Sequence, residues 1–150
     1  RGLGDVYKRQ MYHFPTKEAL MTAVIDHLLD GYERDLAARL ATTNPNVPTI
    51  SERLAAYVDW ACDGPFDYGD LVMFTDPRLR EPLTERWNSR MGAWVDVPET
   101  LPADQRARLH GVRLLADGIW LNTAGNGIAL SDEDTDAIRA LAHHLIQENS

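Results

Sequence analysis

The chain has 150 residues, of which 44% are hydrophobic and 25% are charged, ordinary values for a globular domain with its own core. Its single cysteine, Cys62, excludes an internal disulfide and is compatible with a reducing cytoplasm. The longest apolar runs fall far short of the roughly 20 residues that a membrane helix requires, and residues 1–10 lack the apolar stretch of a secretory signal. We therefore expect one cytoplasmic domain that does not bind or cross a membrane.

The charge balance excludes a broad nucleic-acid-binding surface. The chain carries 15 basic and 23 acidic residues, a net charge of −8, and three of the basic residues lie within residues 1–10. Affinity for nucleic acids depends mainly on neutralising phosphate charges. We therefore expect any contact with DNA to be confined to a small local site.

The first predicted element is one long amphipathic helix. Apolar residues recur at helical spacing from Leu20 to Leu40. Thr16 is placed to cap this helix by accepting a backbone N–H, and the Pro- and Asn-rich residues 44–48 end it.

The second and third predicted elements are also helices. The spacing from Thr49 to Glu52 fits a capping box at the start of a helix, and Gly64 followed by proline ends that helix. Residues 67–74 then predict a short helix.

Three helices are predicted in the rest of the chain. One has Pro77 in its first position and continues through Trp94, with a first turn that Pro82 makes irregular. After a linker, a long helix covers about residues 103–123, and its two apolar faces need two partners. Ser131 caps the last helix, whose first turn is acidic. No alternating strand pattern occurs, so the predicted fold class is all-α, a multi-helix bundle.

The sequence from Met11 to Leu20, MYHFPTKEAL, resembles the end of the helix-turn-helix module in TetR-family (tetracycline-repressor-like) transcriptional regulators. In that family the stretch closes the recognition helix and opens the helix that leads into the ligand-binding core. The physical sense is clear, because Pro15 breaks the preceding helix and Thr16 starts the next. The last two predicted helices are similar to the pair through which such domains dimerise. The resemblance thus implies the family's ligand-binding and dimerisation bundle.

The resemblance also implies a division of the chain. We expect residues 1–10 to be a non-native or disordered leader, similar to translated adapter sequence. Residues 11–16 would be the remnant of the helix-turn-helix DNA-binding module, because a complete family member carries about 40 residues more of a three-helix reader before this point. Residues 17–150 would be the effector-binding and dimerisation domain.

Three sets of residues are candidate sites for a regulator of this kind. For the intact parent protein, the resemblance implies contacts with DNA phosphates by Tyr12, His13 and Lys17, which set register and carry no base information; in this chain alone they are simply solvated. The large aromatic, methionine and histidine side chains between the middle helices are candidates for an effector pocket or, alternatively, for ordinary core. These are Tyr57, Trp60, Met73, Phe74, Trp87, Met91, Trp94, His110 and Trp120.

The last two predicted helices supply the candidate dimer face. Gly118 permits close approach of helices, and the apolar side chains around it form a second face that packs either on another copy or within the monomer. The residues are Leu114, Gly118, Leu121, Ile138, Leu141 and Leu145.

Catalytic and metal-binding functions are not expected. The acidic residues at 132–136 imitate a calcium loop, but Ala137 replaces the required glycine and His143 replaces the bidentate glutamate. Adjacent histidines point about 100° apart on a helix and do not form a metal pair. Cys62 with His110 is a weak nucleophile and base pair, since a lone cysteine on an apolar helix is usually core. We expect no enzyme, no cofactor and no metal.

The sequence therefore predicts a ligand-responsive transcriptional repressor of which mainly the sensory domain is present. The expected partners are a second copy of the chain and an unknown small apolar or amphipathic effector, with operator DNA bound only by the full-length parent. The alternative is a helical protein-interaction module that has no small-molecule site.

Overall fold

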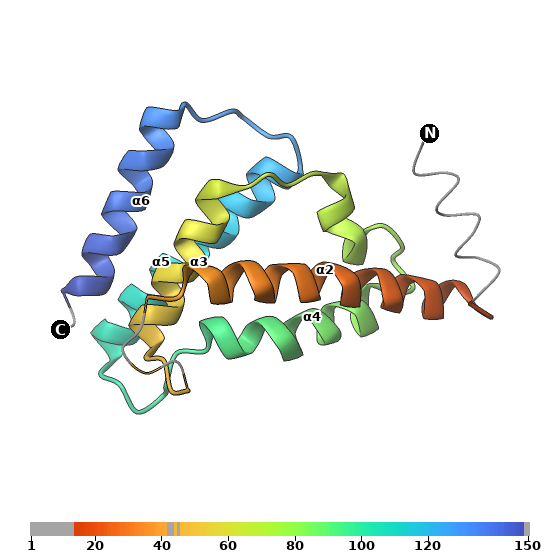
Figure 1. Cartoon of the computed structure of the whole chain (residues 1–150), viewed down its shortest axis with the longest axis horizontal. Helices are drawn as coiled ribbons and strands as arrows, with labels where there is room; N and C mark the ends of the chain where they lie inside the picture. Colours follow the sequence, from red (N-terminus) through yellow and green to blue (C-terminus); the bar gives the residue numbers. More distant parts are fainter. Residues whose placement is uncertain (1–13, 42–43, 45, 149–150) are drawn as a thin grey trace.

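The computed structural model describes residues 14–41, 44 and 46–148 of the chain, and all regular structure in these residues is helical (Figure 1). The predicted all-α fold class is confirmed for this part of the protein. The elements are α2 (Lys17–Arg39), α3 (Ile50–Asp63), the 3-10 helix η1 (Tyr68–Phe74), α4 (Arg80–Val95), α5 (Ala103–Ala124) and α6 (Asp132–Gln147).

Side-chain caps mark the starts of α2, α3 and α6. The Thr16 hydroxyl accepts from the Ala19 amide at 3.0 Å at the start of α2. Thr49 and Glu52 form the predicted capping box of α3. Ser131 caps α6 by accepting from an amide of its first turn at 3.0 Å. These caps were predictable because they satisfy the free N–H groups of a first turn with side chains three residues away.

The start of α4 differs from the prediction. Pro77 lies in a turn, closed by a 3.0 Å hydrogen bond from the Leu79 amide to the Asp76 carbonyl, and the helix begins only at Arg80. Pro82 is therefore in the first turn of α4, where a missing N–H costs no intrahelical hydrogen bond.

Helix α3 lies at the centre of the fold and packs against α2, α4, α5 and α6. Helix α2 runs alongside α4, whereas α6 lies at the other end of the molecule against α3 and α5 (Figure 1). The core is apolar, and its centre is inaccessible to solvent, as burial of apolar area requires. The fully buried residues include Ile25, Leu29, Leu36, Leu54, Val58, Val112 and Ala116.

Candidate ligand cavity

A cavity of about 440 Å³ lies between α4 and α5, two helices that do not pack closely on each other. Helix α3 and η1 supply one lining residue each, Asp96 directly follows α4, and α4 and α5 supply the others. The lining residues are Tyr57, Phe74, Trp87, Asn88, Met91, Gly92, Val95, Asp96, Arg113, Asp117, Trp120 and Leu121.

Five of the residues predicted to line an effector pocket come together here: Tyr57, Phe74, Trp87, Met91 and Trp120. The indole rings of Trp87 and Trp120 span the gap between α4 and α5, with centroids 5.0 Å apart and planes tilted by 36°. The two rings are in contact and form one aromatic wall of the cavity, to which α4 and α5 each contribute a side chain.

The other four predicted pocket residues lie elsewhere. Trp60 is core, because its ring stacks on Tyr57 at 5.2 Å and is otherwise enclosed by aromatic rings. Met73 is also buried in the core. Trp94 is half-buried and packs against the core cluster. His110 is exposed and lines a neighbouring depression. These four residues do not line this cavity, because a large apolar side chain between helices serves a core as well as a cavity and His110 faces the depression beside it.

Sequence reasoning missed the polar residues of the cavity, which are Asn88, Asp96, Arg113 and Asp117. A usable signal was present on α5, since positions 113, 117 and 120 lie on one helix face at spacings of four and three. The Tyr57 hydroxyl donates to Asp117 Oδ1 at 2.6 Å. Burial, followed by the nearby Asp117 carboxylate, raises the pKa of Tyr57 well above its ordinary value. The tyrosine hydroxyl therefore stays a hydrogen-bond donor at physiological pH.

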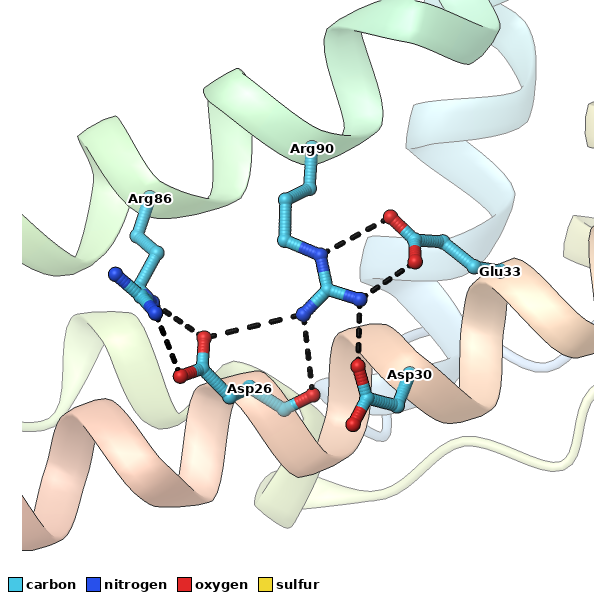
Figure 2. A network of polar contacts seen from close by, with 5 residues as sticks. All are labelled: Asp26, Asp30, Glu33, Arg86 and Arg90. Carbon is cyan, nitrogen blue, oxygen red and sulfur yellow. Dashed lines mark hydrogen bonds and ion pairs between the residues drawn. The ribbon is translucent and has the colours of Figure 1, made fainter.

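A network of ion pairs joins α4 to α2 (Figure 2). Arg86 forms a two-pronged contact with Asp26, with its Nη2 at 2.7 Å from Oδ2. The Arg90 guanidinium donates to Asp30 Oδ1 at 2.6 Å and, through Nε, to Glu33 Oε1 at 3.0 Å. Hydrogen bonding to Arg86 holds the pKa of the Asp26 carboxyl below its ordinary value. Ion pairs at the protein surface thus join α4 to α2.

Helix α4 therefore has two different working faces. Trp87 and Met91 line the cavity, while Arg86 and Arg90, each one position earlier in sequence, contact α2. A shift of α4 caused by something in the cavity would act directly on the ion pairs to α2.

Two further contacts link α2 to the segment that precedes α4. Lys17 Nζ lies 2.8 Å from the buried Asp76 carboxylate. The hydrogen bonds from Lys17 and Arg78 hold the pKa of Asp76 well below its usual range. In η1, the buried Asp70 carboxylate accepts a hydrogen bond from the Tyr32 hydroxyl.

Lys17 was predicted to contact DNA phosphate, and here its ammonium is paired with Asp76 while its side chain remains 55% exposed. The other two predicted phosphate contacts, Tyr12 and His13, lie outside the described residues. The pairing fixes the position of Lys17 in the first turn of α2 and leaves part of its side chain open to solvent.

The predicted dimer face is open where α5 and α6 meet the solvent. Leu114 and Leu141 are 58% and 51% exposed, and Leu121 is also exposed. A Cβ atom added to Gly118 would meet nothing within 4 Å, so this glycine leaves room on the outside of α5. Ile138 and Leu145, predicted on the same face, are half-buried and pack against the core.

The described residues hold no group of three or more His, Cys, Asp or Glu side chains arranged to bind a metal ion. Burial raises the pKa of the Cys62 thiol, which is the opposite of the shift that activates a cysteine nucleophile. Between residues 14 and 148, none of the helices combines the length and apolarity needed to cross a bilayer.

No protein-family model, curated protein or solved structure matches the chain. What points to a function is the geometry of the cavity, together with the short motif that leads into α2.

Proposed function

We propose that residues 17–150 form the effector-binding and dimerisation domain of a DNA-binding transcriptional regulator of the TetR type, a repressor whose grip on DNA responds to a small ligand. The observation that carries the proposal is the cavity between α4 and α5, whose α4 wall is ion-paired to α2. Helix α2 is the element that directly follows the helix-turn-helix-like motif, so it is the natural link between a sensor and a DNA reader.

Contacts at two points along α2 support coupling between the cavity and this helix. Phe74 lines the cavity, and two residues later Asp76 holds Lys17 in the first turn of α2. Further along α2, Arg90 of α4 holds Glu33. A ligand that displaces η1 or α4 would therefore shift α2 at two points. A coupling free energy of about 1–3 kcal/mol between ligand and DNA is enough for a regulatory switch.

A homodimer built on α5 and α6 would give the repressor its two-fold symmetry. Such symmetry lets two readers meet two half-sites of an operator. The exposed leucines Leu114 and Leu141, with the open position at Gly118, support this face. Leu114→Asp and Leu141→Asp should each convert dimer to monomer in sedimentation equilibrium. Val47→Asp, at a 71% exposed side chain outside α5 and α6, is the control.

The regulatory proposal is tested with a chimera in which a helix-turn-helix domain of known operator is joined directly before Thr16. The chimera should repress a reporter, and a screen of small organic compounds should find one that relieves repression. Asn88→Trp, which fills the cavity from α4, should abolish the response. Ser89→Trp, at the neighbouring exposed position that does not line the cavity, should retain it.

A chimera that represses but ignores every compound, or whose response survives Asn88→Trp, would contradict the sensor. In that case the exposed apolar face of α5 and α6 would favour a helical protein-interaction module.

A further inference from the structure

The aromatic surfaces of the cavity indicate part of what it binds. Phe74, Trp87 and Trp120 line it, and the two indoles, which come from different helices, touch each other and form one aromatic surface. Aromatic faces are electron-rich and attract cations as well as apolar groups, with Trp the strongest. The walls therefore suit an apolar or aromatic body, and they accept a positive charge next to it.

The charged groups of the cavity are unequal in number. Two carboxylates, Asp96 and Asp117, face one guanidinium, Arg113. Arg113 Nε lies 4.0 Å from Asp117 Oδ2, so this cation already has an anionic neighbour. Asp96 forms no hydrogen bond through its carboxylate, and no ion pair, with any residue in the described part of the chain. The cavity thus carries one carboxylate more than its own cation compensates.

The neighbouring depression does not reverse this balance. It shares Val95, Asp96 and Arg113 with the cavity and adds one carboxylate, Glu99, one guanidinium, Arg106, and the side chains of Val97 and His110. The Arg106 guanidinium is committed to two main-chain carbonyls, of residues 99 and 101, at 3.2 and 2.7 Å. An acidic ligand would meet a further carboxylate, Glu99, here and compete with Asp117 for Arg113.

We propose that the cavity binds a small organic cation with an aromatic or apolar body. Trp87 and Trp120 hold the body, and Asp96 and Asp117 neutralise the charge. This inference rests on the proposed sensor function and names its class of effector. It narrows the expected effector from any apolar or amphipathic compound to a positively charged one.

Three probes of similar size separate charge from shape. Benzyltrimethylammonium is a cation, neopentylbenzene is its neutral isostere, and phenylacetate is an aromatic anion. Binding to the full chain is measured by titration calorimetry and by the change in tryptophan fluorescence that Trp87 and Trp120 should report. We expect the cation to bind about tenfold or more tightly than the neutral isostere, as cation–aromatic and carboxylate contacts in a partly desolvated site predict.

Variants of the two carboxylates measure how much their charge contributes to binding of the cation. Asp96→Asn and Asp117→Asn should each weaken binding of the cation about threefold to tenfold and leave the affinity for the neutral isostere unchanged. Asp96 is exposed, so its variant keeps the test valid if the Asp117 variant unfolds. The control is Asp104→Asn, at an exposed acidic residue of α5 that lines neither the cavity nor the depression.

Equal binding of the cation and its neutral isostere would overturn the cation inference and leave the sensor function standing. Tighter binding of phenylacetate would overturn it in favour of an anion held by Arg113. Binding of none of the three would also overturn it. The sensor function itself fails in a different experiment, the chimera that represses but responds to no compound.

Discussion

The two walls of the cavity are held in place by different forces. Helix α5 has 22 residues, and six of them are buried: Leu109, Val112, Ala116, Ile119, Trp120 and Ala124. Helix α4 has 16 residues but buries only Leu83 and Met91. Helix α5 packs on both α3 and α6, whereas α4 packs on α3 and meets α2 through the ion pairs of Figure 2 and the edge-on contact of Trp87 with Tyr32.

This difference indicates which of the two helices, α4 or α5, is held more weakly. Burying a large apolar side chain contributes about 1.5–3 kcal/mol, while an exposed ion pair contributes about 0–1 kcal/mol. We therefore infer that α5, with six buried side chains against two, is the more firmly held wall of the cavity, and that α4 yields at lower cost. Because α4 is also the wall attached to α2, motion of this wall is the motion that reaches the start of the domain.

The largest expected effect is the loss of stability when a buried side chain of α5 is truncated. Leu109→Ala removes a side chain that is 2% exposed, and we expect the free energy of unfolding in urea to fall by about 2–5 kcal/mol. Val47→Ala, at a 71% exposed side chain outside the proposed dimer face, should change it by less than about 0.5 kcal/mol. Equal effects of the two variants would mean that α5 is not anchored as described.

The next effect concerns the buried link between α2 and η1. Tyr32→Phe deletes the hydroxyl that donates to the buried Asp70 carboxylate, and should lower the free energy of unfolding by about 1–3 kcal/mol. The matched control is Tyr68→Phe, since Tyr68 is 68% exposed and its hydroxyl reaches only the Gly125 carbonyl at 3.2 Å. If the two substitutions proved equally mild, the Tyr32 link would not be a strong tie.

A smaller effect, on hydrogen exchange in α4, is expected when the ion pairs between α4 and α2 are removed. Arg90→Gln removes the contacts to Asp30 and Glu33. Amide hydrogen exchange in α4 should then speed up by about twofold to fivefold with little change in α5. The difference should shrink in 1 M salt, which screens exposed charges. Arg80→Gln, at an α4 residue without an ion pair to any described residue, should leave exchange unchanged.

The smallest effect is a dependence on pH at the start of α2. Asp76 has a lower pKa in the folded protein than the value of about 3.9 that holds in an unfolded chain. Its contribution to stability is therefore present above about pH 4 and is lost as the pH falls further. Asp76→Asn should make the loss of stability between about pH 4 and pH 2 shallower in urea titrations. A decline as steep as that of the unaltered protein would show that Asp76 is not involved.

Local features of the fold were predictable from sequence, and long-range ones were not. Thr16, Thr49 and Ser131 were correctly expected to cap helices, because a cap depends on residues three positions away. The start of α4 was misplaced by three residues: Asp76 closes a turn there, and its carboxylate also pairs with Lys17, 59 residues earlier in the chain.

The candidate site was predictable only in part, for a related reason. Aromatic side chains such as Trp87 and Trp120 stand out in a sequence, but so does Trp60, which is core. Whether a residue lines a cavity depends on which helices fail to pack, and this depends on the whole bundle. Asp117 shares a helix face with Trp120 at a spacing readable in the sequence, whereas Asp96 belongs to the site only because α4 and α5 lie opposite each other.

The most direct test of the account is the distance between the two walls. Spin labels at Ser89→Cys on α4 and Ala107→Cys on α5, in a Cys62→Ser background, are measured by double electron–electron resonance with and without saturating benzyltrimethylammonium. Labels at Ala107→Cys and Ala140→Cys report α5 against α6. We expect the first distance distribution to shift and the second to stay unchanged. Binding detected by calorimetry with no change in the α4–α5 distance, or with a change between α5 and α6 instead, would contradict a mobile α4 wall.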